Sequence, residues 1–159
     1  MAFIKKEIQG LSNDQIFFRA RELAFNNQRR EARILCNYIL NDLPNYADVR
    51  TLKGRTLAWD KDYKNAEKEL LEVTKRNPYY YDSYLALMDI YWWSNQDNKG
   101  IEIAKKALKN EVKNPELGIK LAKAYQRTNN IAMAKKAIDS MLRKLPNNSD
   151  ILKLKNDIQ

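Results

Sequence analysis

Residues 47–80 have the sequence ADVRTLKGRTLAWDKDYKNAEKELLEVTKRNPYY, in which two apolar, helix-like halves can be recognised. A polar break, Asp60-Lys61-Asp62, separates the two halves, as expected for a short turn. Pro78 follows the second half and disfavours helical geometry in the residue before it, so it marks the end of a helix. The stretch therefore predicts two helices joined by a tight turn.

The same pattern returns about every 34 residues on both sides of this stretch. Pro44 and Pro78 are one interval apart, Pro146 follows two intervals later, and Val112 occupies the missing place. Small residues share the interval at Ala32, Ala66, Gly100 and Ala134. A constant period of about 34 residues is the signature of a repeat protein. Four units without insertions follow, at residues 13–46, 47–80, 81–114 and 115–148.

Helix signals recur inside the units. Apolar residues three and four places apart predict a helix in the first half of the third unit, at Tyr84, Leu87, Met88 and Tyr91. Ser12 and Gln15 have the spacing of a capping box. Asn114 before Pro115 is typical of an N-cap followed by proline at the first helical position.

A single hairpin of two helices cannot bury its own apolar face, so neighbouring units are expected to stack. The sequence predicts an all-α fold, a right-handed α-solenoid of four helix hairpins. An N-terminal leader at residues 1–12 precedes the repeats, and a capping helix at 149–159 follows them. In the capping helix Ile151, Leu152 and Leu154 are expected to face the last repeat.

The recurring columns resemble the tetratricopeptide repeat (TPR). The second unit carries most of the signature, at Gly54, Tyr63, Ala66, Leu70 and Pro78. The resemblance covers about residues 13–148 and implies a scaffold that mediates protein–protein interaction. It says little about a specific partner, because one fold hosts many functions.

Two phrases support a narrower resemblance. GR-x-x-AW at residues 54–59 and D-x-x-x-W at residues 89–93 are similar to the periplasmic TPR segment of some bacterial outer-membrane proteins. This resemblance implies a periplasmic location within an envelope assembly, with membrane association supplied only by a segment outside this sequence. The alternative is a cytoplasmic adaptor.

The TPR resemblance also implies that the first helix of each unit lines a concave groove. Among the residues at the groove places, one set is an aromatic stripe: Phe25, Trp59, Trp92 and Trp93. A second set is charged: Arg21, Arg55, Asp89, Lys123 and Arg127. Such a surface can stack on a proline or sugar ring and hold its polar groups, so a protein, peptide or glycan partner is predicted. The alternative is that Trp59, and one of Trp92 and Trp93, pack between helices. A helix cannot bury two adjacent tryptophans on one face, so at least one of Trp92 and Trp93 is expected to be partly exposed.

The chain has 29 Lys and Arg against 20 Asp and Glu, a net charge of +9. Such a charge favours acidic partners, nucleic acid included. The basic residues are scattered, however, and an acidic residue recurs at the second, groove-lining place of each unit: Asp14, Asp48, Asp82 and Glu116. These carboxylates would repel phosphate, so a nucleic-acid binder is kept only as an alternative.

The composition argues against catalysis. With no His and one Cys, a zinc-finger pattern and a Cys/His or Ser/His pair within this chain are excluded. The sequence therefore predicts no enzyme activity, no cofactor and no metal. Cys36 falls on a core column and is expected to be buried. Of Tyr79, Tyr80 and Tyr81, one is expected to pack and another to form part of a protein contact.

Overall fold

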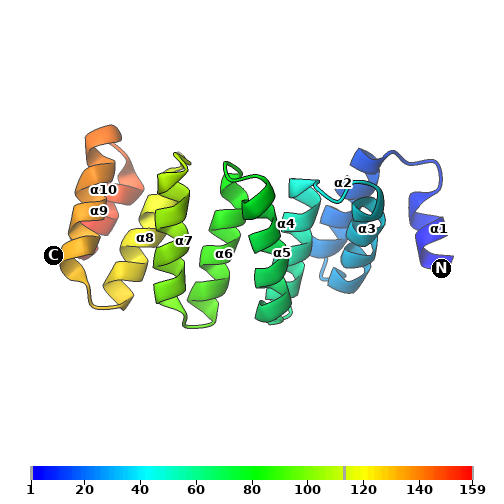
Figure 1. Cartoon of the computed structure of the whole chain (residues 1–159), viewed down its shortest axis with the longest axis horizontal. Helices are drawn as coiled ribbons and strands as arrows, with labels where there is room; N and C mark the ends of the chain where they lie inside the picture. Colours follow the sequence, from blue (N-terminus) through cyan, green and yellow to red (C-terminus); the bar gives the residue numbers. More distant parts are fainter. Residues whose placement is uncertain (1, 113, 159) are drawn as a thin grey trace. The chain divides into compact units, whose positions relative to one another are not determined.

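The computed structural model describes residues 2–112 and 114–158, and every regular element in this part of the chain is an α-helix (Figure 1). The helices are α1 (Ala2–Ile8), α2 (Asn13–Phe25), α3 (Arg29–Asp42), α4 (Ala47–Trp59), α5 (Tyr63–Arg76), α6 (Tyr81–Trp93), α7 (Asp97–Lys109), α8 (Pro115–Arg127), α9 (Ile131–Lys144) and α10 (Ser149–Asp157). The predicted all-α class is confirmed. No helix in the described residues is long and apolar enough to cross a membrane.

Helices α2 to α9 form four hairpins, and the turn inside each hairpin is built the same way. Its central residue has a left-handed backbone, with φ between 56° and 65°, at Asn27, Lys61, Asn95 and Asn129. The residue after it donates its amide hydrogen to the carbonyl five places back, as in the 2.8 Å bond from Gln28 to Leu23. Asparagine tolerates this conformation better than lysine does.

The repeating proline explains how the second helices end. Helices α3, α5 and α9 stop two residues before Pro44, Pro78 and Pro146. Helix α7, in the unit that has Val112 in place of proline, is one residue shorter and ends at Lys109. Its chain turns through Glu111 at φ 58°, and the Val112 amide donates to the Ala107 carbonyl over 3.0 Å. The loss of one proline therefore changes the turn between the third and fourth hairpins.

Both predicted caps are present. The Ser12 hydroxyl accepts from the Gln15 amide at 3.3 Å, and the Gln15 side chain accepts from the Ser12 amide at 2.9 Å. The Asn114 side chain accepts from the Glu116 amide at 2.8 Å, with Pro115 in the first turn of α8. These bonds satisfy amides that a helix start leaves without a partner.

The chain divides into two compact units on either side of the Asn77–Pro78 bond. The first unit holds α1 to α5, and α3 packs on α4 to bring its two hairpins together. Its core includes Leu23, Leu35 and Ile39, all within 2% of complete burial. Phe3 and Ile8 of α1 pack against this core.

The second unit holds α6 to α10, with α7 packed on α8 and α10 packed on α9. Ile151 and Leu154 of α10 are buried, as predicted, but Leu152 is 41% exposed and the prediction for it was wrong. The physical reason is helical geometry: residues 151 and 154 lie on one face, and residue 152 points about 100° away from residue 151.

Candidate functional site

The nine predicted groove residues all lie on first helices, but they belong to two separate compact units. Arg21 and Phe25 lie on α2, and Arg55 and Trp59 on α4, in the first unit. The second unit has the other five: Asp89, Trp92 and Trp93 on α6, and Lys123 and Arg127 on α8. The nine residues therefore fall into two sets, four in the first unit and five in the second.

Phe25 and Trp59 come together at the C-terminal ends of α2 and α4. Their ring centroids lie 5.7 Å apart and their planes are tilted by 48°. Phe25 is 69% exposed, whereas Trp59 is half-buried and packs against the core of the first unit. Part of the Trp59 side chain therefore packs inside the unit, as the alternative prediction stated. Phe25 is the more accessible ring of the pair.

Each of these aromatic residues has an arginine one helical turn before it. Arg21 precedes Phe25 by four residues and is exposed, and Arg55 precedes Trp59 by four residues and is half-buried. Side chains four residues apart lie on the same helix face. The two helices of this surface therefore carry the same pair of residue types, arginine followed by an aromatic ring.

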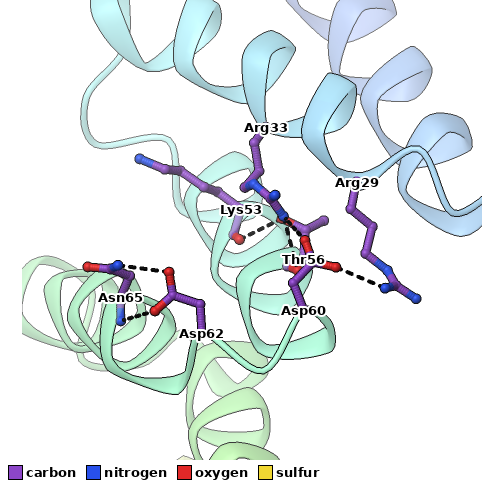
Figure 2. A network of polar contacts seen from close by, with 7 residues as sticks. All are labelled: Arg29, Arg33, Lys53, Thr56, Asp60, Asp62 and Asn65. Atoms are coloured by element: carbon purple, nitrogen blue, oxygen red, sulfur yellow. Dashed lines mark hydrogen bonds and ion pairs between the residues drawn. The ribbon is translucent and has the colours of Figure 1, made fainter.

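A network of arginines beside this surface was not predicted (Figure 2). Arg29 donates to one oxygen of Asp60 at 2.9 Å, and Arg33 donates to the other at 2.7 Å and to the Thr56 carbonyl at 3.2 Å. Burial by itself would raise the pKa of the Asp60 carboxyl, but the hydrogen bonds and charges of the two arginines outweigh it and lower that pKa. The guanidinium carbon of Arg29 also lies 6.0 Å from the Trp59 ring centroid.

The network joins the first hairpin to the second within the first unit. Figure 2 shows Arg29 and Arg33 reaching from α3 to Asp60, just after the end of α4. Asp62, two residues further, caps α5 by accepting from the Asn65 amide at 3.3 Å. Arg29 and Arg33 lie on α3, a second helix, whereas the predicted groove places lie only on first helices, so the repeat pattern does not point to them.

In the second unit, Trp92 and Arg127 form a cation–π pair. The guanidinium carbon of Arg127 lies 4.0 Å from the Trp92 ring centroid. The same guanidinium forms an ion pair with Asp97 at 3.2 Å and donates to the Asn95 side chain at 3.1 Å. Arg127 is therefore held in place on the indole face before any partner arrives.

Trp92 and Trp93 are both accessible, at 39% and 44% exposure. The expectation that at least one of these neighbours would be exposed is confirmed, and the structure exposes the second as well. Two indoles and a fixed guanidinium thus share the end of α6 and α8. Trp and Arg are the residue types that contribute most to binding at protein interfaces.

In the second unit, the predicted groove residue Asp89 forms its ion pair with a lysine outside the predicted set. Asp89 pairs with Lys120 of α8, one helical turn before the predicted Lys123, which is exposed. Asp89, Trp92, Asp97 and Lys120 help to line a cavity of about 30 Å³. A cavity of that size holds a water molecule and no larger ligand. The candidate site in this unit is therefore its exposed aromatic and arginine surface.

Cys36 is fully buried, as expected, and burial raises the pKa of its thiol to about 12. Tyr79 and Tyr81 are exposed, whereas Tyr80 is half-buried and stacks on Tyr81 at 6.4 Å between centroids. Among the side chains that the structure describes, no three His, Cys, Asp or Glu residues are grouped as metal ligands.

No protein-family model matches this chain, and no curated protein matches it. Solved structures do. A thermophilic TPR protein of Thermus thermophilus, TTC0263, is 17% identical with a TM-score of 0.73, covering 98% of this chain and 84% of its own. A tetratricopeptide repeat protein from Parabacteroides merdae is 12% identical with a TM-score of 0.74, covering 98% and 61%.

A third similar structure is Naa15/Naa10 bound to HypK-THB, at 16% identity and a TM-score of 0.71, covering 92% of this chain and 22% of that one. At these identities the likeness concerns the fold. The chain has the sequential helix hairpins of a TPR-like solenoid, which confirms the fold predicted from its repeat period.

Proposed function

We propose that this protein is a non-catalytic scaffold that binds a protein partner through the aromatic and arginine side chains on its first helices. The observation that carries the proposal is the Trp92–Arg127 pair with Trp93 exposed beside it. Rings and guanidinium groups held in place before binding lose little conformational freedom when a partner docks. One of the solved structures with a similar fold is itself a protein complex.

The charges on this surface indicate the kind of peptide it takes. Arg127 is compensated by Asp97, and Lys120 by Asp89. A strongly acidic peptide would therefore gain little from Arg127 or Lys120, because both already have carboxylate partners. A peptide or helix with apolar and proline side chains fits better, since it can stack on Trp92 and Trp93 and leave those ion pairs intact.

The test is a selection from a random peptide library displayed against the whole chain. We expect the selected peptides to bind at least tenfold more weakly to Trp92→Ala and Arg127→Ala. Tyr38→Ala is the matched control, because Tyr38 is 37% exposed on α3, a second helix. Selected peptides whose affinity is unchanged by both site variants would contradict the proposal, as would binding to cell-wall glycan fragments alone.

The periplasmic location in an envelope assembly is proposed on the two sequence phrases at residues 54–59 and 89–93. Sequencing the locus on both sides of this chain tests it. A secretory signal upstream and an outer-membrane segment downstream would support it. A reading frame that encodes only these 159 residues would contradict it and favour the cytoplasmic adaptor.

A further inference from the structure

The outer face of α2 carries a symmetrical set of exposed side chains. Residues 18–25 have the sequence FRARELAF, and the exposed residues of this run are Phe18, Arg21, Glu22 and Phe25. Residues three, four and seven places apart lie on one face of a helix, so the four side chains share one side of α2. Phe18 lies three residues before Arg21, and Phe25 lies three residues after Glu22, so the pattern is the same from either end.

The two phenylalanines of this face are well exposed, Phe18 at 63% and Phe25 at 69%. Single exposed apolar residues are common on protein surfaces, but two large rings on one helix face form a patch, which is typical of an interaction site. Helix α1 packs on the core of the first unit through Phe3 and Ile8, yet it leaves both rings open to solvent.

The same helix face is covered in later repeats. Phe18 and Glu22 hold the sixth and tenth places of the first repeat, which Leu52 and Thr56 hold in the second. Leu52 and Thr56 are buried, in a hairpin on which α3 of the preceding hairpin packs. In the fourth repeat the tenth place is Ala124, which is also buried, and there α7 packs on α8. The face of α2 thus lies where other repeats have a packed neighbour.

The charges of this face fit a second copy of the same face. A two-fold interface has to be self-complementary, because the same patch is present on both subunits. When two α2 helices pack antiparallel about an axis between residues 21 and 22, Arg21 lies opposite Glu22 of the other copy and Phe18 lies opposite Phe25. Each attractive pair then occurs twice. A parallel arrangement would set Arg21 against Arg21 and Glu22 against Glu22, which is repulsive.

Glu22 is free enough to take part in such a pair. It forms an ion pair with Arg19 of its own helix at 3.2 Å, with the two side chains 45% and 40% exposed. An exposed ion pair of this kind contributes little to stability, so it does not prevent Glu22 from pairing with an arginine of another copy.

We propose that the chain forms a reversible two-fold dimer in which α2 packs antiparallel on α2 of a second copy. Phe18 of each copy packs on Phe25 of the other, and Arg21 of each pairs with Glu22 of the other. One pair of helices covers less than the roughly 1,200 Å² of a stable interface, so we expect a dissociation constant on the order of 10–100 μM. This gives α2 a role separate from the Trp92–Arg127 surface of the second unit.

The experiment is sedimentation velocity of the whole chain from about 5 μM to 500 μM, a range that brackets the expected dissociation constant. Phe18→Ala should weaken the dimer by about tenfold or more, because the truncated contact occurs twice in a two-fold interface. Tyr79→Ala is the matched control, since Tyr79 is a 74% exposed aromatic residue outside α2, and it should dimerise as the wild type does. Circular dichroism of each variant shows whether it is folded.

Charge reversal tests the antiparallel arrangement itself. Arg21→Glu sets two carboxylates against each other across the axis, and Glu22→Arg sets two arginines against each other, so each variant alone should stay monomeric over the same range. An equimolar mixture of the two variants should dimerise, because every carboxylate then lies opposite an arginine. The double variant Arg21→Glu with Glu22→Arg should dimerise by itself for the same reason. A variant that had merely lost its helix would not regain association in the mixture.

Four outcomes would overturn the proposal. A wild-type chain that stays monomeric over the whole range would show that α2 does not bind a second copy. A dimer unchanged by Phe18→Ala would place the interface elsewhere. A mixture of the two charge variants that stays monomeric would exclude the antiparallel pairing. Growth beyond the dimer would indicate head-to-tail association, which is not closed by a two-fold axis.

The fate of this proposal is distinguishable from that of the proposed function. Trp92→Ala should weaken the selected peptides and leave the dimer unchanged, whereas Phe18→Ala should weaken the dimer. Either result can therefore fail without the other.

Discussion

Arg33 donates from its guanidinium to the carboxylate of Asp60 over 2.7 Å, and this bond ties α3 to the end of α4. Arg29 donates to the other carboxylate oxygen, so one acidic group satisfies two arginines from the neighbouring hairpin. The Asp60 side chain is 35% exposed, which places the network at the border between core and solvent. It is a link between repeats within the first unit.

Asp60→Asn should lower the free energy of unfolding by about 1 kcal/mol at pH 7, because it removes the charge that both arginines use. The pKa of the Asp60 carboxyl is lowered in the folded state, so its stabilisation is present above the unfolded pKa of about 3.9 and is lost as the pH falls below that. Urea unfolding of both proteins between pH 7 and pH 2 measures this. A difference that stays constant down to pH 2 would contradict the assignment.

Replacing glycine by alanine is expected to have opposite effects on stability at Gly54 and at Gly100. A Cβ on Gly54 would lie 2.7 Å from Cγ of the fully buried Leu70, so Gly54→Ala should destabilise the protein by about 1–3 kcal/mol. A Cβ on Gly100 would lie 3.6 Å from Tyr91 Cβ, an ordinary contact, so Gly100→Ala should stabilise α7 by about 0.5–1 kcal/mol. Thermal unfolding of the two variants gives the signs, and equal signs would be incompatible with these helix contacts.

Lys61 is the one lysine among the four left-handed turn residues that asparagine otherwise occupies. Lys61→Asn should raise the free energy of unfolding by about 0.5–1 kcal/mol, because asparagine tolerates a positive φ. Asn27→Lys is the reverse change at the equivalent turn and should destabilise by a similar amount. Lys61→Met removes the charge and keeps the strain, so it should leave the denaturant midpoint unchanged; a gain there would point to charge instead.

Cys36 should make the protein sensitive to alkali. Burial raises its pKa from 9.0 to about 12, so the stability that this shift contributes is present below pH 9 and is lost as the pH rises toward 12. The difference in unfolding free energy between the wild type and Cys36→Ala should therefore shrink across that interval. A thiol reagent at pH 8 should label Cys36 only in urea, and labelling of the folded chain at the rate of a free thiol would refute its burial.

Signals close together in the sequence were enough to predict the helices and the repeat. Pro44 and Pro78 mark helix ends, Ser12 and Gln15 form a cap, and the constant repeat interval places the hairpins. Each of these features depends on backbone geometry over a few residues, or on a pattern that recurs along the chain. They could therefore be read without knowledge of any contact between distant residues.

Only the tertiary structure decided which charged side chains form ion pairs with each other. Asp89 pairs with Lys120 although Lys123 holds a groove place, and Asp60 takes two arginines from a helix outside the groove scheme. Neighbouring residues on one helix differ by about 100° in direction, so a small rotation of the packed helix determines which side chain reaches across. Likewise, Gly118 was visible in the sequence, but only the tertiary structure shows that Met141 of α9 packs directly on it.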